Sequence, residues 1–230
     1  MKYDLDIVIP VYFEERNITE TLENILKRIK INFRIIVVYD YLEDPTVSEI
    51  KNNFNDKRII LLKNKFSGLN GAVKTAFKIS DAKAAILYTA EDHQNYDVIN
   101  KMYDKFNEGY DVVCASRLMA GGDYYQAQVK EPLIKSILVK IVSYILSNFT
   151  SLQTTDPTNG FRLFSNEIIR KFPIESKRGF TFAIELLAKA YRNNYKITEV
   201  PSNTPTRKMG NSKFKYKTII FYLPWFINIL

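Results

Sequence analysis

Cysteine, histidine and tryptophan are scarce in this sequence, which contains one residue of each kind. A single cysteine excludes an internal disulfide, and Cys114 lies in the apolar run 111–116, where a thiol packs as a small apolar side chain. A zinc site needs several cysteine or histidine ligands at regular spacing, so the lone His93 does not indicate one. Zinc chemistry and disulfide stabilisation are therefore excluded as starting hypotheses.

A signal peptide and a membrane-spanning run are also missing. The N-terminus lacks the basic, apolar and small-residue order of a signal peptide, which predicts a cytoplasmic protein. The apolar stretch 218–230 is too short to cross a bilayer and is interrupted by Pro224. It follows a basic, acid-free stretch from Pro201 to Lys217, and this order favours a segment lying on the cytoplasmic face of a membrane. A terminal helix docked on the core is the alternative.

Positive charge is in excess, with 33 basic against 25 acidic residues and a formal net charge of +8 at pH 7. Such a surface suits phosphates or anionic lipid. Nucleic-acid binding is disfavoured, because the basic residues cluster beside an apolar stretch instead of alternating with aromatic residues on a stacking surface. The hydrophobic content of 46% is enough for a full core and excludes a disordered chain.

Apolar runs of strand length alternate with segments of helical spacing. The runs lie at 5–11, 34–39, 58–62, 84–89 and 111–116, and the helical segments at about 17–30, 45–54, 68–79 and 96–107. A helix at about 131–148, a strand at 161–165, a helix at about 181–193 and a strand at 196–200 complete the pattern. It predicts an α/β protein with a mostly parallel central sheet, helices on both faces and a ligand cleft at the carboxyl ends of the strands.

Polar residues follow several of these runs. In the first run Pro10 ends the strand ladder and opens a loop through Tyr12 and Glu14, where a nucleotide site is expected. At the end of the second run, the Asp40 carboxylate can accept hydrogen bonds from a base or ribose hydroxyl, whereas Asp44 before Pro45 is predicted to cap the next helix.

Several motifs, taken in chain order, resemble the family 2 glycosyltransferases, specifically the polyprenyl- and dolichol-phosphate sugar (mannose) synthases. The stretch 156–162 resembles the family's Asp-x-x-Ser-Gly-Phe-Arg, with Asn159 for serine. Arg117 follows a serine and precedes Gly121-Gly122, as in the family. The stretch 207–213 resembles the family's Arg-x-x-Gly-x-Ser-Lys loop. The resemblance spans about 4–213 and implies a Rossmann-like GT-A fold.

The resemblance also implies roles for individual residues. Thr89-Ala90-Glu91 stands where the family has Asp-x-Asp, so Glu91 is the expected ligand of Mg²⁺ or Mn²⁺, with Asp92 or His93 as a helper. The predicted catalytic residues are Glu91, Arg117 and Asp156. The predicted donor-binding residues are Pro10, Tyr12, Glu14, Asp40, Gly68, Gly71, Ala90, Arg207 and Lys213, and the predicted contacts to the acceptor phosphate are Arg117, Lys130 and Ser136.

Roles within the second half are left partly open. Asp156 is expected to orient the sugar or act as a base, and Glu185 to face the cleft or pair with Arg162. The expected organisation is one GT-A domain over 1–213, with a nucleotide-binding half at 1–117 and an acceptor-binding half at 118–213. The segment 214–230 follows it.

The function implied is inverting transfer of a sugar from a GDP- or UDP-linked donor to a polyprenyl phosphate at a membrane surface. An ionised acceptor phosphate needs positioning and leaving-group stabilisation more than a strong base. Two alternatives stay open: transfer to a soluble glycan or protein, which would require a base such as Asp156, and a subunit that binds a nucleotide sugar or lipid without catalysis.

Overall fold

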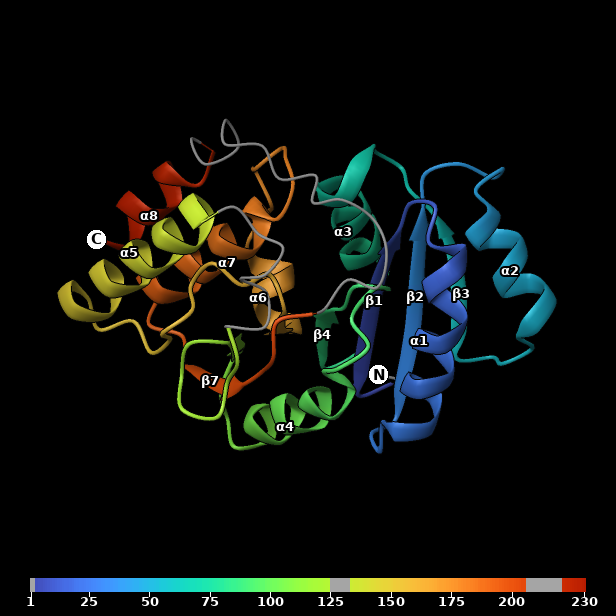
Figure 1. The fold of residues 1–230 in the computed structure, drawn as a ribbon, viewed down its shortest axis with the longest axis horizontal. Helices are drawn as coiled ribbons and strands as arrows, with labels where there is room; N and C mark the ends of the chain where they lie inside the picture. The colour runs from blue at the N-terminus through green and yellow to red at the C-terminus, as the bar shows by residue number, and fades with distance from the viewer. Residues whose placement is uncertain (1–2, 125–132, 206–220) are drawn as a thin grey trace.

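A computed structural model describes residues 3–124, 133–205 and 221–230, and over these ranges the chain folds as a single sheet with helices on both faces (Figure 1). The sheet has seven strands in the order β3-β2-β1-β4-β6-β5-β7. Strand β6 runs antiparallel to its neighbours β4 and β5, and the other pairs are parallel. The predicted mostly parallel sheet is therefore confirmed.

The strands are β1 Leu5–Val11, β2 Phe33–Tyr39, β3 Ile59–Lys63, β4 Ala84–Leu87, β5 Val112–Ser116, β6 Arg162–Ser165 and β7 Ile197–Pro201. The helices are α1 Glu15–Arg28, α2 Pro45–Asn53, α3 Gly68–Ile79, α4 Tyr96–Asn107, α5 Leu133–Phe149, α6 Asn166–Lys171, α7 Thr181–Arg192 and α8 Leu223–Ile229. The expected elements are present, and their ends differ from the predicted ones by a few residues.

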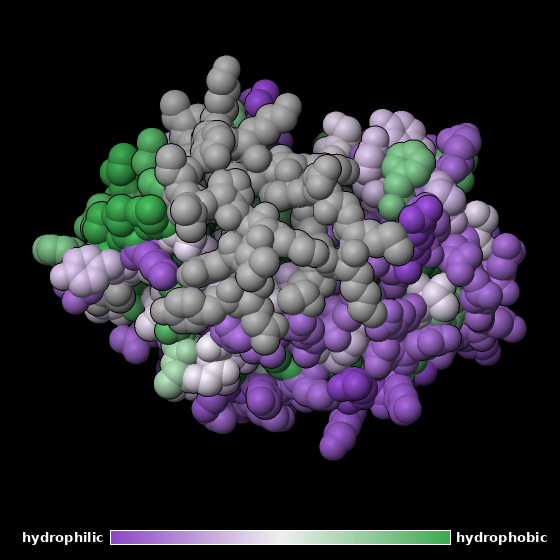
Figure 2. Space-filling view, in the orientation of Figure 1, coloured by the Kyte–Doolittle hydropathy of each residue, from purple (hydrophilic) through white to green (hydrophobic). Residues whose placement is uncertain are grey.

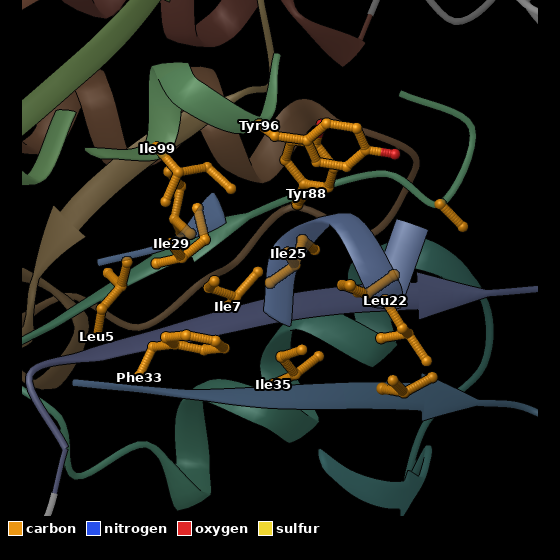
Figure 3. Packing of buried hydrophobic residues seen from close by; sticks show 14 of the residues in the cluster. Leu5, Ile7, Leu22, Ile25, Ile29, Phe33, Ile35, Tyr88, Tyr96 and Ile99 are labelled. Atoms are coloured by element: carbon orange, nitrogen blue, oxygen red, sulfur yellow. The ribbon is translucent and has the colours of Figure 1, made fainter. Parts of the chain in front are cut away.

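Two hydrophobic clusters hold the layers together, one on each face of the sheet. Helices α1, α2 and α4 pack on one face, where Leu22 and Ile25 of α1 point toward Ile7 and Ile35 of the strands (Figure 3). Buried side chains of α3, α6 and α7 cover the other face, together with Leu146 of α5. Both faces carry a cluster because successive strand residues point to opposite faces of the sheet. A strand that is apolar throughout therefore needs helices on both sides.

The prediction that Pro10 ends its ladder is wrong. Strand β1 continues to Val11, and Pro10 lies opposite Val38 of β2. Val8, two residues earlier, accepts from the Tyr88 N–H on the β4 side, and Pro10 faces that same side by its register. Strand β4 ends at Leu87, opposite Val8, so β4 does not extend to Pro10 and no β4 carbonyl requires the N–H that proline lacks. The fourth strand is shorter than the predicted 84–89.

The structure adds a short helix, α6, and describes residues 221–230 of the C-terminal segment. Ser165 caps α6 by accepting from the Ile168 N–H, a signal that the apolar run 161–165 obscured. Helix α8 contacts α7 and buries Ile229, as expected of a docked terminal helix, but Leu223, Ile227 and Leu230 stay exposed. Within the described ranges, no helix combines the length and apolar character needed to cross a membrane.

Candidate active site

The loops after β1 and β2 are tied to each other at the carboxyl edge of the sheet. The Phe13 N–H donates to Asp44 Oδ2 at 2.9 Å, and the Glu14 N–H donates to Thr46 Oγ1 at 2.8 Å. Asp44 also accepts from the Thr46 N–H at the start of α2, so the predicted cap is confirmed. The Glu14 carboxylate accepts from Asn17 of α1, which leaves the first loop braced on both sides.

Aromatic side chains line this edge. The Tyr12 ring lies 4.8 Å from Phe13 and 6.3 Å from Tyr41, centroid to centroid. About half of each side chain is exposed, at 48% for Tyr12, 54% for Phe13 and 53% for Tyr41. These rings form a partly apolar rim beside Asp40 that a planar base can contact.

Asp40, the predicted donor-binding carboxylate, lies at the tip of β2. Its Oδ1 accepts from Asn64 Nδ2 at 2.6 Å, and its Oδ2 accepts from the Gly68 N–H at 3.0 Å. Asn64 in turn accepts from the Phe66 N–H and the Thr75 hydroxyl. Asp40 is half-buried and held in one orientation, and carboxylate oxygens retain capacity for a further donor.

The two predicted glycines, Gly68 and Gly71, shape the turn into α3. Gly68 has φ +70°, a left-handed conformation that favours glycine. A Cβ at Gly71 would lie 2.7 Å from Phe66 Cβ, so the loop folds back on itself too closely for any side chain. The close approach seen here is to the chain itself, and the predicted contact with donor stays a prediction.

Glu91 lies in the loop that follows β4, and this loop is fastened from two sides. The Thr21 hydroxyl of α1 donates to the Ala90 carbonyl at 2.6 Å, and the buried Tyr88 hydroxyl donates to the Asp92 carbonyl at 2.7 Å. Ala90 is buried and Glu91 is half-buried. The position of Glu91 at the carboxyl end of a central strand is therefore well defined.

Asp92 is turned into its own loop. Its Oδ1 accepts from the Gln94 N–H at 3.0 Å and the Asn95 N–H at 3.1 Å, and its side chain is further bonded by Asn95 Nδ2. Asp92 is 3% exposed, and this burial raises its pKa although the hydrogen bonds act against it. Among the residues that the structure describes, no three His, Cys, Asp or Glu side chains group as a metal cage.

Arg117 directly follows β5, further along the carboxyl edge of the sheet, and forms an ion pair with Asp156 through two side-chain hydrogen bonds. Arg117 Nε donates to Asp156 Oδ2 at 2.6 Å, Nη2 donates to Oδ1 at 3.0 Å, and the Arg117 N–H also donates to Oδ2. Asp156 is fully buried, while 12% of the Arg117 side chain is exposed. The guanidinium lies over the Tyr124 ring, 5.0 Å from its centroid.

The environment of Asp156 favours its charged form. Burial by itself would raise the pKa of this carboxyl, but the charge of Arg117 and the hydrogen bonds from Arg117 and Thr158 together outweigh it and lower the pKa. A carboxylate held this way is a weak proton acceptor.

Arg162 and Glu185 do not pair with each other. Arg162 is fully buried and donates to the Ala183 and Pro157 carbonyls, at 2.7 and 2.5 Å. Glu185 is also fully buried and accepts from Lys189 at 2.7 Å and from the backbone N–H groups of Glu175 and Ser176. The expectation that Glu185 faces the cleft or pairs with Arg162 is wrong, because the loop before α7 folds onto this carboxylate.

The remaining predicted site residues are Lys130, Ser136, Arg207 and Lys213. Lys130, Arg207 and Lys213 lie outside the described residues, and their roles stay predictions. Ser136 lies on α5 with 7% of its surface exposed.

Sequence reasoning missed Asn64 and Asn95, whose amides orient Asp40 and Asp92. Their only signal was an asparagine in a loop at the carboxyl edge of the sheet.

The observed arrangement defines the class of protein. A mostly parallel sheet carries Asp40 after β2 and Glu91 after β4, the two strands on either side of β1, with a guanidinium further along the same edge, as in nucleotide-binding α/β folds. Residues 6–175 match the family model for glycosyl transferase family 2. The chain belongs to glycosyl transferase family 2.

Two curated proteins from archaea are similar to most of this chain. The chain is 27% identical over 223 residues to a dolichol-phosphate mannosyltransferase of Pyrococcus furiosus, covering 95% of this chain and 61% of that protein. It is 30% identical over 213 residues to an uncharacterized protein of Methanocaldococcus jannaschii, covering 88% of this chain and 82% of that protein. The chain thus spans about three fifths of the mannosyltransferase.

Solved structures confirm the fold. Glucosyl-3-phosphoglycerate synthase from Mycobacterium tuberculosis, in complex with Mn²⁺, UDP and glucosyl-3-phosphoglycerate, superposes with a TM-score of 0.69 at 14% sequence identity. The match covers 99% of this chain and 79% of that one. The predicted GT-A fold is thereby confirmed.

Proposed function

We propose that this chain transfers a sugar, with inversion, from a nucleotide-diphosphate donor to a polyprenyl phosphate. The observation that carries the choice of acceptor is the ion pair between Arg117 and the fully buried Asp156. A hydroxyl acceptor must lose a proton during transfer and needs a general base, whereas a phosphate acceptor is already ionised at neutral pH. The lowered pKa of Asp156 disfavours it as that base.

Arg117 has the chemistry to recognise an acceptor phosphate in this proposal. Its planar guanidinium matches phosphate geometry, and part of the side chain is exposed at the carboxyl edge. Asp156 orients the guanidinium from within the protein, and the Tyr124 ring supports it. The likeness to the Pyrococcus furiosus dolichol-phosphate mannosyltransferase supports a lipid-linked phosphate as acceptor.

Donor binding is proposed at Asp40 and Glu91. Asp40, beside the Tyr12 and Tyr41 rings, would accept from the base or ribose, and Glu91 would hold Mg²⁺ or Mn²⁺ against the diphosphate. Magnesium in phosphate sites is commonly held by one or two carboxylates together with substrate phosphates and water, so a single glutamate fits this kind of site. The structural neighbours bind UDP with Mn²⁺ or Mg²⁺. A bound metal would stabilise the charge that develops on the leaving diphosphate.

A peripheral position on the cytoplasmic face of a membrane is part of the proposal, and the outward face of α5 supports it. Described buried side chains of α5 include Ser136 and Ser143, while the side chains turned to solvent are largely apolar. The exposed ones are Ile137, Ile141, Tyr144, Ile145 and Phe149, with exposed fractions from 37% to 73%. Figure 2 shows hydrophobic side chains gathered over α8 and the neighbouring part of α5.

Removing two of these apolar side chains is expected to weaken membrane binding. An Ile141→Glu, Tyr144→Glu variant should bind vesicles of phosphatidylcholine and phosphatidylglycerol at least about tenfold less tightly, because each buried apolar side chain contributes about 1.5–3 kcal/mol. Co-sedimentation with vesicles measures this. Ile79→Glu, a change at an exposed isoleucine of α3, is the matched control. Equal binding by all three proteins would contradict a membrane role for α5.

The acceptor assignment is tested by offering different acceptors to one preparation. The chain is incubated with UDP- and GDP-sugars, Mg²⁺ or Mn²⁺, and either a short polyprenyl phosphate, the matching polyprenol, 3-phosphoglycerate or a soluble glycan. Mass spectrometry is expected to show one added sugar on the polyprenyl phosphate only. Product on the glycan would favour the base-dependent alternative. Product on 3-phosphoglycerate alone would assign a small phosphorylated acceptor in place of the lipid. No product with any acceptor would favour the alternative of a subunit that binds without catalysis.

A further inference from the structure

Asn95 connects two loops that are far apart in the sequence. It is 1% exposed, and its Nδ2 donates both to the Asp92 carboxylate, at 2.8 Å to Oδ2, and to the Asn203 carbonyl at 2.9 Å. Its Oδ1 accepts from the Asn203 N–H at 2.9 Å. Each polar atom of this side chain therefore has a partner inside the protein.

The contact between Asn95 and Asn203 has the form of a strand pairing. The side-chain amide exchanges a donor and an acceptor with the N–H and C=O of one backbone residue, as a neighbouring strand would. Residue 203 lies just after β7, whereas Asn95 directly precedes α4. The loop that carries Glu91 is thus fixed to the chain that leaves the last strand of the sheet.

Asn203 is also joined to the segment that follows Arg117. It forms a parallel bridge with Asp123, whose carbonyl accepts from the Thr204 N–H at 2.8 Å. The next residue, Tyr124, packs under the Arg117 guanidinium. A continuous chain of contacts therefore runs from the Glu91 loop through Asn95 and Asn203 to the Arg117 side of the edge.

We propose that Asn95 is a positioning residue that sets the Glu91 loop relative to the Arg117 side, so that donor and acceptor bind at a reactive separation. The proposal rests on the proposed function, in which Glu91 serves the donor and Arg117 the acceptor. Group transfer is sensitive to such alignment, and a displacement of about 1 Å between reacting groups costs about 10²-fold in rate. Neither aspartate nor alanine at this position can donate to the Asn203 carbonyl.

The link itself is tested without any substrate. Hydrogen exchange in the native chain and in Asn95→Ala is expected to show faster exchange of the Asn203 N–H in the variant. The Thr204 N–H, which donates to Asp123, should stay protected. Unchanged protection at Asn203 would show that the side chain does not hold this strand end, whether or not the chain is a transferase.

The positioning role is tested by comparing transfer with hydrolysis of the donor. In Asn95→Ala and Asn95→Asp, the kcat for transfer to the polyprenyl phosphate should fall about 10²-fold, while donor hydrolysis by water changes little, because water needs no alignment with the Arg117 side. Asn166→Ala is the matched control, since Asn166 Nδ2 donates to the Ala82 carbonyl just before β4, at the opposite edge of the sheet.

The two variants and the control separate positioning from simple loss of folded protein. A structural role alone would reduce transfer and hydrolysis by the same factor, and that result, or a transfer-to-hydrolysis ratio equal to that of Asn166→Ala, would overturn the proposal. If Asn95→Ala does not fold, Asn95→Asp keeps the side-chain volume and the acceptor toward the Asn203 N–H. If the native chain itself shows no transfer, the proposed function fails while the exchange result still judges the link.

Discussion

Replacing Arg117 by alanine is expected to destabilise the chain by about 3–5 kcal/mol, because it leaves the Asp156 carboxylate buried without its partner charge. Asp156 is fully buried and accepts from both the side chain and the backbone of Arg117. In a chain of this size each kcal/mol corresponds to about 2–4 °C in Tm, so thermal unfolding should show a large decrease. The same variant should lose transfer to polyprenyl phosphate.

A double variant separates the two effects. Replacing both members of a buried ion pair by apolar side chains is often neutral for stability, so Arg117→Leu with Asp156→Leu should recover most of the lost Tm. It should still fail to use the lipid phosphate, because no guanidinium remains. A single Arg117→Ala variant with native Tm and unchanged KM for the lipid would refute both the structural and the acceptor role.

The ion pair also gives a signature in acid. The pKa of Asp156 lies below its ordinary value of 3.8 in the folded chain. Its contribution to stability is therefore complete above that pH and is lost as the pH falls through the folded value. In unfolding experiments across this range, the native chain should lose stability more steeply than the double variant.

Replacing Glu91 by glutamine is expected to lower kcat about 10²- to 10³-fold, because the change removes the charge that holds a metal against the leaving diphosphate. Glutamine keeps the size of the side chain, so the fastenings at Ala90 and Asp92 should persist and Tm should change little. Turnover should also lose most of its dependence on Mn²⁺ concentration. Steady-state kinetics over a Mn²⁺ titration measure both effects.

A charge-matched control accompanies this variant. Glu23 on α1 is exposed, and Glu23→Gln removes the same charge away from the proposed site. It should keep native turnover. If Glu91→Gln and Glu23→Gln behaved alike, Glu91 would have no part in catalysis, and the family's Asp-x-Asp position would have lost its function in this chain.

Much of the fold could be predicted because its signals are local. Apolar runs of strand length and helical spacing gave β1, β2 and α3 with boundaries close to those observed. The prediction for Pro10 was wrong because the cost of a missing N–H depends on whether a neighbouring strand needs it. Pro10 faces the β4 side, and β4 ends before it reaches Pro10. Helix α6 was missed because it directly follows β6 with no loop between them.

The site was less predictable because its contacts join distant parts of the chain. Glu185 was expected near Arg162, but each binds backbone groups that no local pattern indicates. Asn95 contacts Asn203 across more than a hundred residues. Motifs in sequence order located the residues of the carboxyl edge, whereas the partners that orient them emerged only from the sheet topology.

The most direct test of this account is binding of nucleoside diphosphate at the carboxyl edge of the sheet. Titration calorimetry of UDP and GDP, with and without Mn²⁺, is applied to the native chain and to Glu91→Gln. The account predicts that one nucleotide binds, that Mn²⁺ strengthens binding to the native chain, and that this metal effect is lost in Glu91→Gln. Absence of binding by either nucleotide to the folded native chain, with or without Mn²⁺, would contradict it.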